Sequence, residues 1–217
     1  MLDTSLIPPA SGGPPAALIA ILHGYGANGA DLMPLAQAWR QTLPDAAFAV
    51  PDAHQPCADS PFGGRQWWPL DFERVAESSI AGAAAARPVI DAWLARLWHD
   101  TGLGPQQTVL TGFSQGAMLA LHAALAQPEP LAGVVGFSGA LIPPTELGIA
   151  PKLPVLLAHG DLDGVVEPMR SRSAARDLEA LGYDVDLVIS PAVAHSIAPE
   201  GFAAATAFLG RVLPRRA

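Results

Sequence analysis

The residues best placed to do chemistry are Gly-Phe-Ser-Gln-Gly at positions 112–116. They follow an apolar, β-prone run and precede a helical run that begins at Ala117. A serine hydroxyl is a poor nucleophile unless the fold holds it clear of the backbone, facing a base. Glycine has no Cβ, so Gly112 and Gly116 allow a strand and a helix to approach closely around such a turn. The pattern predicts that Ser114 is a catalytic nucleophile.

An activated serine needs a base and an acid that orients the base, and both occur later in the chain. His195 follows a β-prone run at residues 185–189, and Asp163 follows another at residues 155–158. Parallel sheets place such residues at the carboxyl ends of successive strands, in the order serine, acid, histidine. We therefore predict that His195 is the general base and Asp163 its orienting carboxylate. Asp161 is the competing acid, although its more ordinary role is to close a turn.

Acyl transfer also requires donors for the oxygen that becomes negative in the tetrahedral intermediate. The expected donors are the backbone amides of Gln115 and Tyr25. Tyr25 belongs to a Gly-x-Gly-x-x-Gly stretch at residues 24–29, which lies between a predicted strand and a predicted helix. A Rossmann-type dinucleotide-binding protein is therefore a rival interpretation. It would leave the serine turn and the ordered acid and histidine without a role.

Short apolar runs alternate with helical patterns along the chain. Runs that are apolar throughout are typical of strands buried on both faces of a parallel sheet. The alternation predicts one α/β domain over residues 1–217, doubly wound and mostly parallel, with helices on both faces and little or no lid. We expect Pro88 to kink or restart the long second helix. The predicted strands are 17–22, 46–50, 108–111, 133–137, 155–158 and 185–189, and the predicted helices are 31–43, about 74–98, 114–126, 168–181 and 199–212.

Composition limits the class of protein. Half of the 217 residues are hydrophobic and only 15% are charged, which excludes disorder. The net charge of -8 argues against nucleic acid or an anionic membrane as the main partner. The start of the chain lacks a signal-peptide profile, and no apolar run approaches the ~20 residues that span a bilayer, so we expect a cytoplasmic protein. Cys57 is the only cysteine. Neither a metal nor another cofactor is implied.

The residues that would contact an acyl group are predicted from their positions near the chemistry. Trp67 and Trp68 lie in an aromatic, apolar segment, and Leu141 and Val166 flank strand ends close to the predicted triad. A mostly apolar cleft suits an acyl chain, although tryptophans are more often core residues. We expect an open, shallow site for a small-molecule acyl ester or thioester of short or medium chain length. A homodimer is possible.

Four segments together resemble the phospholipase/carboxylesterase family of α/β-hydrolases, which includes the acyl-protein thioesterases. They are LHGYG at 22–26, GFSQGA at 112–117, HGDLDGVV at 159–166 and AHSI at 194–197. The resemblance implies an α/β-hydrolase fold and esterase, thioesterase or lysophospholipase activity, with Ser114, Asp163 and His195 at the catalytic positions. Ala117 and Ala194 differ from the glycines usual in the eukaryotic thioesterases, and GRQWW at 64–68 is closer to the bacterial carboxylesterase branch. A catalytically idle, partner-binding member of the fold is the remaining alternative.

Overall fold

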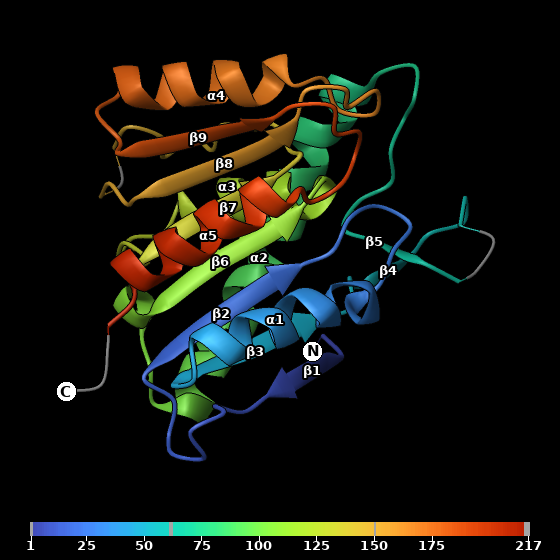
Figure 1. The fold of residues 1–217 in the computed structure, drawn as a ribbon. Coiled ribbons are helices and arrows are strands. Elements are labelled where there is room, and N and C mark those ends of the chain that lie inside the picture. Colours follow the sequence, from blue (N-terminus) through green and yellow to red (C-terminus); the bar gives the residue numbers. More distant parts are fainter. Residues whose placement is uncertain (1, 61–62, 150, 215–217) are drawn as a thin grey trace.

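The computed structural model describes residues 2–60, 63–149 and 151–214, and its centre is a seven-stranded sheet (Figure 1). The strand order is β1-β3-β2-β6-β7-β8-β9, in which only the edge strand β1 is antiparallel to its neighbour. A separate two-stranded hairpin, β4–β5, projects beside the sheet (Figure 1). The strands are β1 Thr4–Ile7, β2 Ala17–Leu22, β3 Ala46–Pro51, β4 Gln55–Pro56, β5 Arg65–Gln66, β6 Thr108–Phe113, β7 Gly133–Phe137, β8 Val155–Gly160 and β9 Val185–Ser190.

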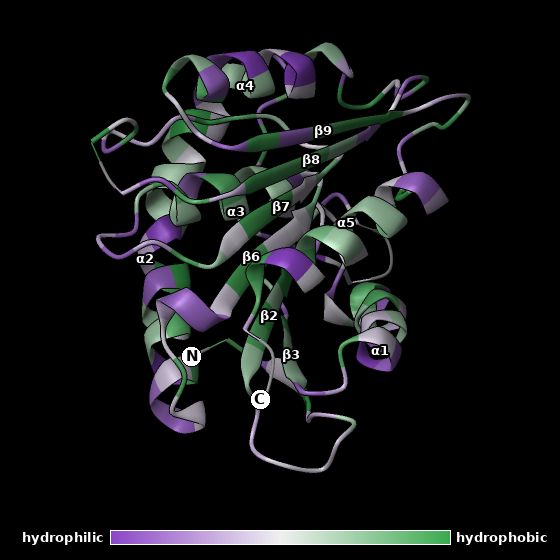
Figure 2. Ribbon diagram, turned by 60° about the vertical axis from the view of Figure 1, so that its left-hand side comes forward, coloured by the Kyte–Doolittle hydropathy of each residue, from purple (hydrophilic) through white to green (hydrophobic). Residues whose placement is uncertain are grey.

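Helices cover both faces of the sheet (Figure 2). Helices α2, α3 and α4 share one apolar core with the sheet, whereas α1 and α5 share the other. Alternate residues of β2 divide between the two cores, with Leu18 and Leu22 on one side and Ile19 and Ile21 on the other. The helices are α1 Met33–Thr42, α2 Val75–Thr101, α3 Gln115–Ala124, α4 Met169–Ala180 and α5 Pro199–Val212, with 3₁₀ turns at Gly29–Leu32 and Pro105–Gln107.

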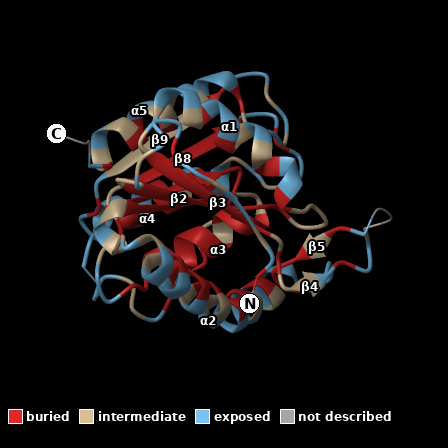
Figure 3. Ribbon diagram, turned by 90° about the horizontal axis from the view of Figure 1, so that it is seen from below, coloured by how far each residue is buried: buried red, intermediate tan, exposed pale blue. Residues whose placement is uncertain are grey.

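Burial explains why the central strands read as unbroken apolar runs. Every residue of β2, β3, β7 and β8 is buried, as Figure 3 shows for the middle of the molecule. A strand with helices on both faces has no side that water reaches, so its residues need not alternate between apolar and polar. The six predicted strands and five predicted helices are confirmed within a few residues at their ends.

The sequence-based prediction differs from the structure at three places. Strand β1 was missed because it is a four-residue edge strand and does not have the pattern of a buried one. The β4–β5 strands are only two residues each, below the length at which periodicity is informative. Helix α2 continues through Pro88 as one element from Val75 to Thr101, so the proline does not divide it.

Strand order identifies the place where loops diverge. Counted along the chain, the six parallel strands lie in the order 2-1-3-4-5-6, whereas a Rossmann dinucleotide fold has 3-2-1-4-5-6. The sheet therefore contradicts the Rossmann interpretation of residues 24–29. The order reverses between β2 and β6, and ligands of open α/β sheets bind outside the carboxyl ends of strands at such a point. The loop after β2 and the turn after β6, which holds Ser114, both lie there.

Candidate functional site

Ser114 lies on a tight turn between β6 and α3. Its backbone has φ 54° and ψ -118°, in a region that L-residues with a side chain rarely adopt. Conformations of this kind cost on the order of 1–3 kcal/mol and persist where the surrounding structure fixes them. The Ser114 amide donates to the carbonyl of Phe137 at 2.9 Å, and its carbonyl accepts from the Met118 amide at 3.1 Å. The turn is therefore held by the neighbouring strand and by the first turn of α3.

The two glycines beside Ser114 lie where no side chain would fit. A Cβ on Gly112 would overlap the backbone of Gly116, and a Cβ on Gly116 would overlap the carbonyl of Leu22 at the end of β2. The expectation from the pentapeptide is confirmed, because strand and helix come together at a distance that only glycine allows. The contact also brings the turn against the β2 loop.

His195 and Asp163 are joined by a hydrogen bond. The Nδ1 atom of His195 lies 2.7 Å from Oδ2 of Asp163. The Asp163 side chain is fully buried, and its Oδ1 accepts from the amides of Val165 and Val166 at 2.9 Å each. The His195 side chain retains 19% exposure. The carboxylate is fixed by its own loop and directs one nitrogen of an accessible imidazole.

The environment of Asp163 favours its charged form. Burial by itself raises the pKa of this carboxyl, but hydrogen bonds from His195 and from the amides of Val166 and Val165 outweigh that effect. The net pKa of Asp163 lies below its ordinary value. At neutral pH the site therefore contains a buried carboxylate hydrogen-bonded to an imidazole, an arrangement that stabilises an imidazolium.

Two further contacts place His195 beside the serine turn. Its ring lies 4.7 Å, centroid to centroid, from the ring of Phe113, the residue before Ser114. The loops that hold the acid and the histidine are tied together, because the Leu162 amide donates to the carbonyl of Val193 at 2.9 Å. Three segments distant in sequence therefore meet at one edge of the sheet.

The loop after β2 forms another wall of this region. A Cβ on Gly24 would lie 3.4 Å from Cβ of Ser114, so the backbone of this loop touches the serine. In the described parts of the chain, the amides of Tyr25 and Gln115 donate to no protein acceptor. Gln115 is the first residue of α3, where backbone amides lack intrahelical partners. Two amides without a protein acceptor thus belong to the residue after Ser114 and to the loop that touches Ser114.

The side chain of Gln115 links the serine turn to the segment that contains Trp67 and Trp68. Its Oε1 accepts from the Trp67 amide and its Nε2 donates to the Trp68 carbonyl, each at 2.9 Å. Both indoles are buried, and Trp68 fills the space left by the missing side chain of Gly82 on α2. Neither tryptophan lines the cavity described below, so the structure gives them a packing position in place of the substrate contact expected from the sequence. The bracing by Gln115 had no signal in the sequence.

His23 fixes the β2 loop in a similar way. Its Nε2 accepts from the Ala53 amide at 2.9 Å, which requires that atom to be unprotonated and leaves the proton on Nδ1, 2.8 Å from the Gly24 carbonyl. Burial lowers the pKa of His23, which favours this neutral tautomer. The indole Nε1 of Trp67 donates to the His23 carbonyl at 2.8 Å. The backbone beside Ser114 is therefore held by buried hydrogen bonds.

An apolar cavity of about 390 Å³ is lined in part by Met118, whose amide donates to the Ser114 carbonyl, and by Val166, whose amide donates to Asp163. It lies between α2, the start of α3, the segment after β7 and the loop that follows Asp163. Leu141 and Val166, which the sequence analysis singled out, are both in its wall. Glu167 and Arg170 add charge at one side. The other lining residues are Val75, Ala76, Ser79, Ile80, Met118, Ala140, Ile142, Pro143 and Val165.

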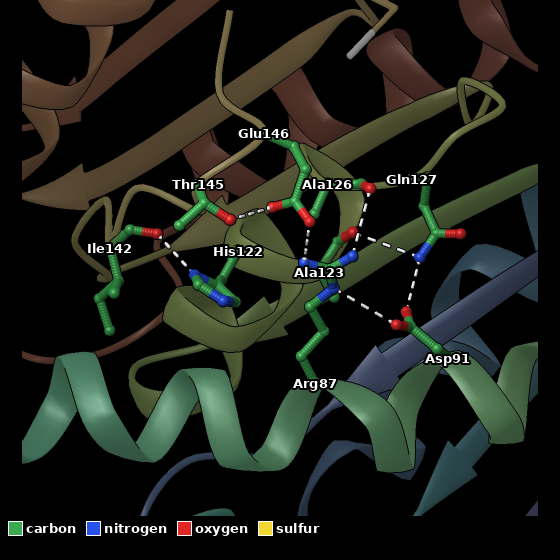
Figure 4. Close-up of polar contacts among 9 residues, drawn as sticks. All are labelled: Arg87, Asp91, His122, Ala123, Ala126, Gln127, Ile142, Thr145 and Glu146. Carbon is green, nitrogen blue, oxygen red and sulfur yellow. Dashed lines mark hydrogen bonds and ion pairs between the residues drawn. The ribbon is translucent and has the colours of Figure 1, made fainter. Parts of the chain in front are cut away.

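A polar network anchors the cavity wall that follows β7 (Figure 4). Arg87 of α2 pairs with Glu146 at 2.8 Å, and His122 of α3 lies with Nδ1 2.9 Å from the Ile142 carbonyl. Arg87 also contacts Asp91, which accepts from Gln127 at 2.7 Å. His122 is thus a buried, hydrogen-bonded residue of α3. The Arg87–Glu146 ion pair and the His122–Ile142 contact hold the segment after β7, which includes Leu141.

The positions of Asp161 and His159 in the structure show what each of these two residues contacts. Asp161 is exposed, and its side chain takes no part in the contact with His195, which is made by Asp163. The strand predicted at 155–158 continues through His159, which is a buried residue of β8. Within 2–60, 63–149 and 151–214, no three His, Cys, Asp or Glu side chains gather as a metal site. In the same ranges, no helix is both long and apolar enough to cross a membrane.

Comparisons with known proteins agree with this geometry. Residues 8–213 match the family model described as Phospholipase/Carboxylesterase. Acyl-protein thioesterase 1 of Gibberella zeae is 29% identical over 216 residues, which cover 91% of each chain. Esterase YpfH of Escherichia coli is 27% identical over 187 residues, which cover 85% of this chain and 78% of that protein.

Solved structures give the same result. The crystal structure of esterase PE8 superposes with a TM-score of 0.93 at 47% sequence identity, covering 98% of this chain and 99% of that one. The Bacillus cereus carboxylesterase has a TM-score of 0.77 at 17% identity, covering 98% and 95% of the two chains, a likeness of fold. The sheet and its helices are thus those of an α/β-hydrolase.

The depressed pKa of Asp163 predicts an acid-labile contribution to stability. A carboxyl whose pKa is lower in the folded state than in the unfolded chain stabilises the fold above about pH 4, and this stabilisation disappears as pH falls through the folded value. Between pH 7 and pH 3, the free energy of unfolding of Asp163→Asn should therefore fall less than that of the wild type. Denaturant unfolding at the two pH values measures this.

Asp161→Asn is the matched control for that measurement, because it removes an exposed carboxylate from the same loop. Its loss of stability between pH 7 and pH 3 should equal that of the wild type. An Asp163→Asn protein with an unchanged pH dependence would show that the buried carboxylate is not held in its charged form by these hydrogen bonds.

Proposed function

Because this chain belongs to the phospholipase/carboxylesterase family of hydrolases, we propose that it cleaves carboxylic esters with a Ser114-His195-Asp163 triad. Its relatives include proteins named as an esterase and as acyl-protein thioesterases. The observation that most supports the triad is the 2.7 Å contact between His195 Nδ1 and Asp163 Oδ2, made beside the turn that holds Ser114. The hydroxyl, imidazole and carboxylate have the types and the order that this chemistry needs.

The proposed reaction begins with proton transfer from Ser114. Since Nδ1 of His195 donates to Asp163, Nε2 is the nitrogen that takes the proton as Oγ attacks the acyl carbonyl. The tetrahedral intermediate then expels the alcohol or thiol, which receives that proton, and leaves an acyl-serine ester. Water attacks this ester with His195 again acting as base, which releases the carboxylic acid and restores the Ser114 hydroxyl.

The oxyanion is proposed to accept from the amides of Tyr25 and Gln115. These two amides have no protein acceptor in the described parts of the chain; Gln115 follows Ser114 directly, and Tyr25 follows Gly24, whose backbone lies against Ser114. The positive end of the α3 dipole lies at the same point, which favours negative charge there. Loss of a single such donor typically reduces turnover by about 10²–10³-fold, so their placement is a major part of the expected rate.

The cavity of about 390 Å³ is proposed to hold the acyl chain. It adjoins Ser114 through Met118, whose amide donates to the Ser114 carbonyl, and through Val166, whose amide donates to Asp163. Its wall is mainly aliphatic, as an alkyl chain requires. Short and medium acyl chains fit a cavity of this size. The attacked carbonyl is common to esters and thioesters, so we propose that both classes are substrates.

The direct test of the proposed nucleophile is Ser114→Ala assayed with a short p-nitrophenyl ester. Loss of the nucleophile of a triad should lower kcat/KM by about 10³-fold or more. Ser138→Ala is the control, since Ser138 directly follows β7 with a similar positive φ of 50° and its buried hydroxyl has no hydrogen-bond partner among the residues that the structure describes. That variant should keep most of the activity. Undiminished turnover by Ser114→Ala would refute the assignment.

The proposed acyl pocket predicts a change in chain-length preference for Ala76→Phe. Ala76 is an exposed residue of α2 in the cavity wall, so a phenyl ring there fills the cavity without disturbing the core. A hexanoyl chain has four methylenes more than an acetyl group, each worth about 0.8 kcal/mol when buried. Losing half of that burial lowers the hexanoate-to-acetate ratio of kcat/KM by about tenfold.

Ala85→Phe, on an exposed position of α2 outside the cavity, provides the comparison. Its hexanoate-to-acetate ratio should match that of the wild type, measured with p-nitrophenyl esters so that the leaving group stays constant. If Ala76→Phe has the same chain-length profile as this control, the acyl chain does not enter the cavity.

A further inference from the structure

Trp67 joins the two backbone segments that contain the proposed oxyanion donors. Its indole Nε1 donates to the His23 carbonyl at 2.8 Å. Its backbone amide donates to Oε1 of Gln115 at 2.9 Å. Among the residues that the structure describes, it alone hydrogen-bonds to both the loop at 23–27 and the turn at 114–118. Because this tryptophan is fully buried, both bonds are shielded from water.

The sheet by itself does not set the position of either donor. Strands β2 and β6 pair with each other up to Leu22 and Gly112, each three positions before the proposed donor of its own segment. The amides of Tyr25 and Gln115 therefore lie beyond the ladder, where neither has a protein acceptor among the described residues. The distance between them depends on contacts made past the end of the sheet, and Trp67 supplies hydrogen bonds to both sides.

The chain on either side of this indole is held to the same two segments. The carbonyl of Arg65 in β5 accepts from the Gly26 amide at 2.9 Å. The carbonyl of Trp68 accepts from Nε2 of Gln115 at 2.9 Å, and the Gln115 side chain is itself buried. Residues 65–68 thus form a short strap that contacts the β2 loop at its start and the serine turn at its end.

We propose that Trp67 is a positioning residue that sets the distance between the amides of Tyr25 and Gln115. This role rests on the proposed function, in which those amides are the oxyanion donors. Trp67 does not line the cavity, so it acts through the two segments and not by touching the acyl chain. The oxyanion exists only in the tetrahedral state, so a displaced donor lowers turnover and leaves the binding of the ground state unchanged.

The test is Trp67→Phe, which keeps an aromatic ring and removes the indole N–H. Displacement of an oxyanion donor should lower kcat/KM on a p-nitrophenyl ester by about tenfold or more. An alkyl trifluoromethyl ketone, to which Ser114 Oγ adds to give an oxyanion, should bind more weakly by the same factor. The matching methyl ketone, bound with its carbonyl intact, should keep its affinity within about twofold. Titration with a fluorophosphonate gives the concentration of active protein, which corrects for any unfolded fraction.

Trp93→Phe is the matched control. Trp93 is a buried residue of α2 whose indole donates to Thr4 Oγ1 of the edge strand β1 at 3.0 Å, so the same kind of bond is lost outside the strap. Its kcat/KM and its affinities for both ketones should match those of the wild type. Gln115→Met keeps the backbone amide at residue 115 but removes both side-chain bonds to the strap. It should reproduce the effect of Trp67→Phe, and it replaces that variant if Trp67→Phe does not fold.

Three results would overturn the proposal: an unchanged kcat/KM in Trp67→Phe, an equal weakening of both ketones, or an equal loss of activity in Trp93→Phe. The same three results decide the matter for Gln115→Met. Activity retained by Ser114→Ala would instead refute the proposed function, so the two failures are distinguishable.

Discussion

The buried carboxylate of Asp163 is the interaction on which the rest of the site depends. A charge removed from water is tolerated only when hydrogen bonds replace its solvation, and this one accepts from two backbone amides and from Nδ1 of His195. Meeting that requirement fixes the loop after β8 and orients His195 from the loop after β9. The donors that stabilise the charge are thus also the contacts that build the site.

A second constraint acts on the backbone around Ser114. The positive φ of this residue is maintained because β6, α3 and β2 converge there, with Gly112 and Gly116 at the points of closest approach. Strand order reverses between β2 and β6, so the loop of Tyr25 and the start of α3 open at that place. The strained turn, the amides without a protein acceptor and the apolar cavity all depend on this strand order. In the proposed mechanism they supply the nucleophile, the oxyanion donors and the acyl pocket.

The sequence predicted the features that depend on local pattern. Apolar runs indicated the strands, and the serine pentapeptide, Asp163 and His195 indicated where chemistry would lie. Contacts between distant segments could not be predicted. Nothing in the composition links Gln115 to Trp67, and the burial of Trp68 depends on the absence of a side chain at Gly82 of α2. The strand predicted at 155–158 stopped short of His159, because the end of β8 is decided by its pairing with β9, where His159 lies opposite Ile189. Leu141 and Val166 lie in the cavity wall, as their positions at strand ends suggested.

If Ser114 is activated by His195 and Asp163, its hydroxyl should react with a serine-directed chemical label. A fluorophosphonate reacts with a serine whose hydroxyl is deprotonated by a neighbouring base, and mass spectrometry of peptides locates the adduct. We expect one adduct per chain, on Ser114, and much slower labelling in Asp163→Asn. An adduct on another residue, or no adduct on the folded wild-type protein, would contradict this activation.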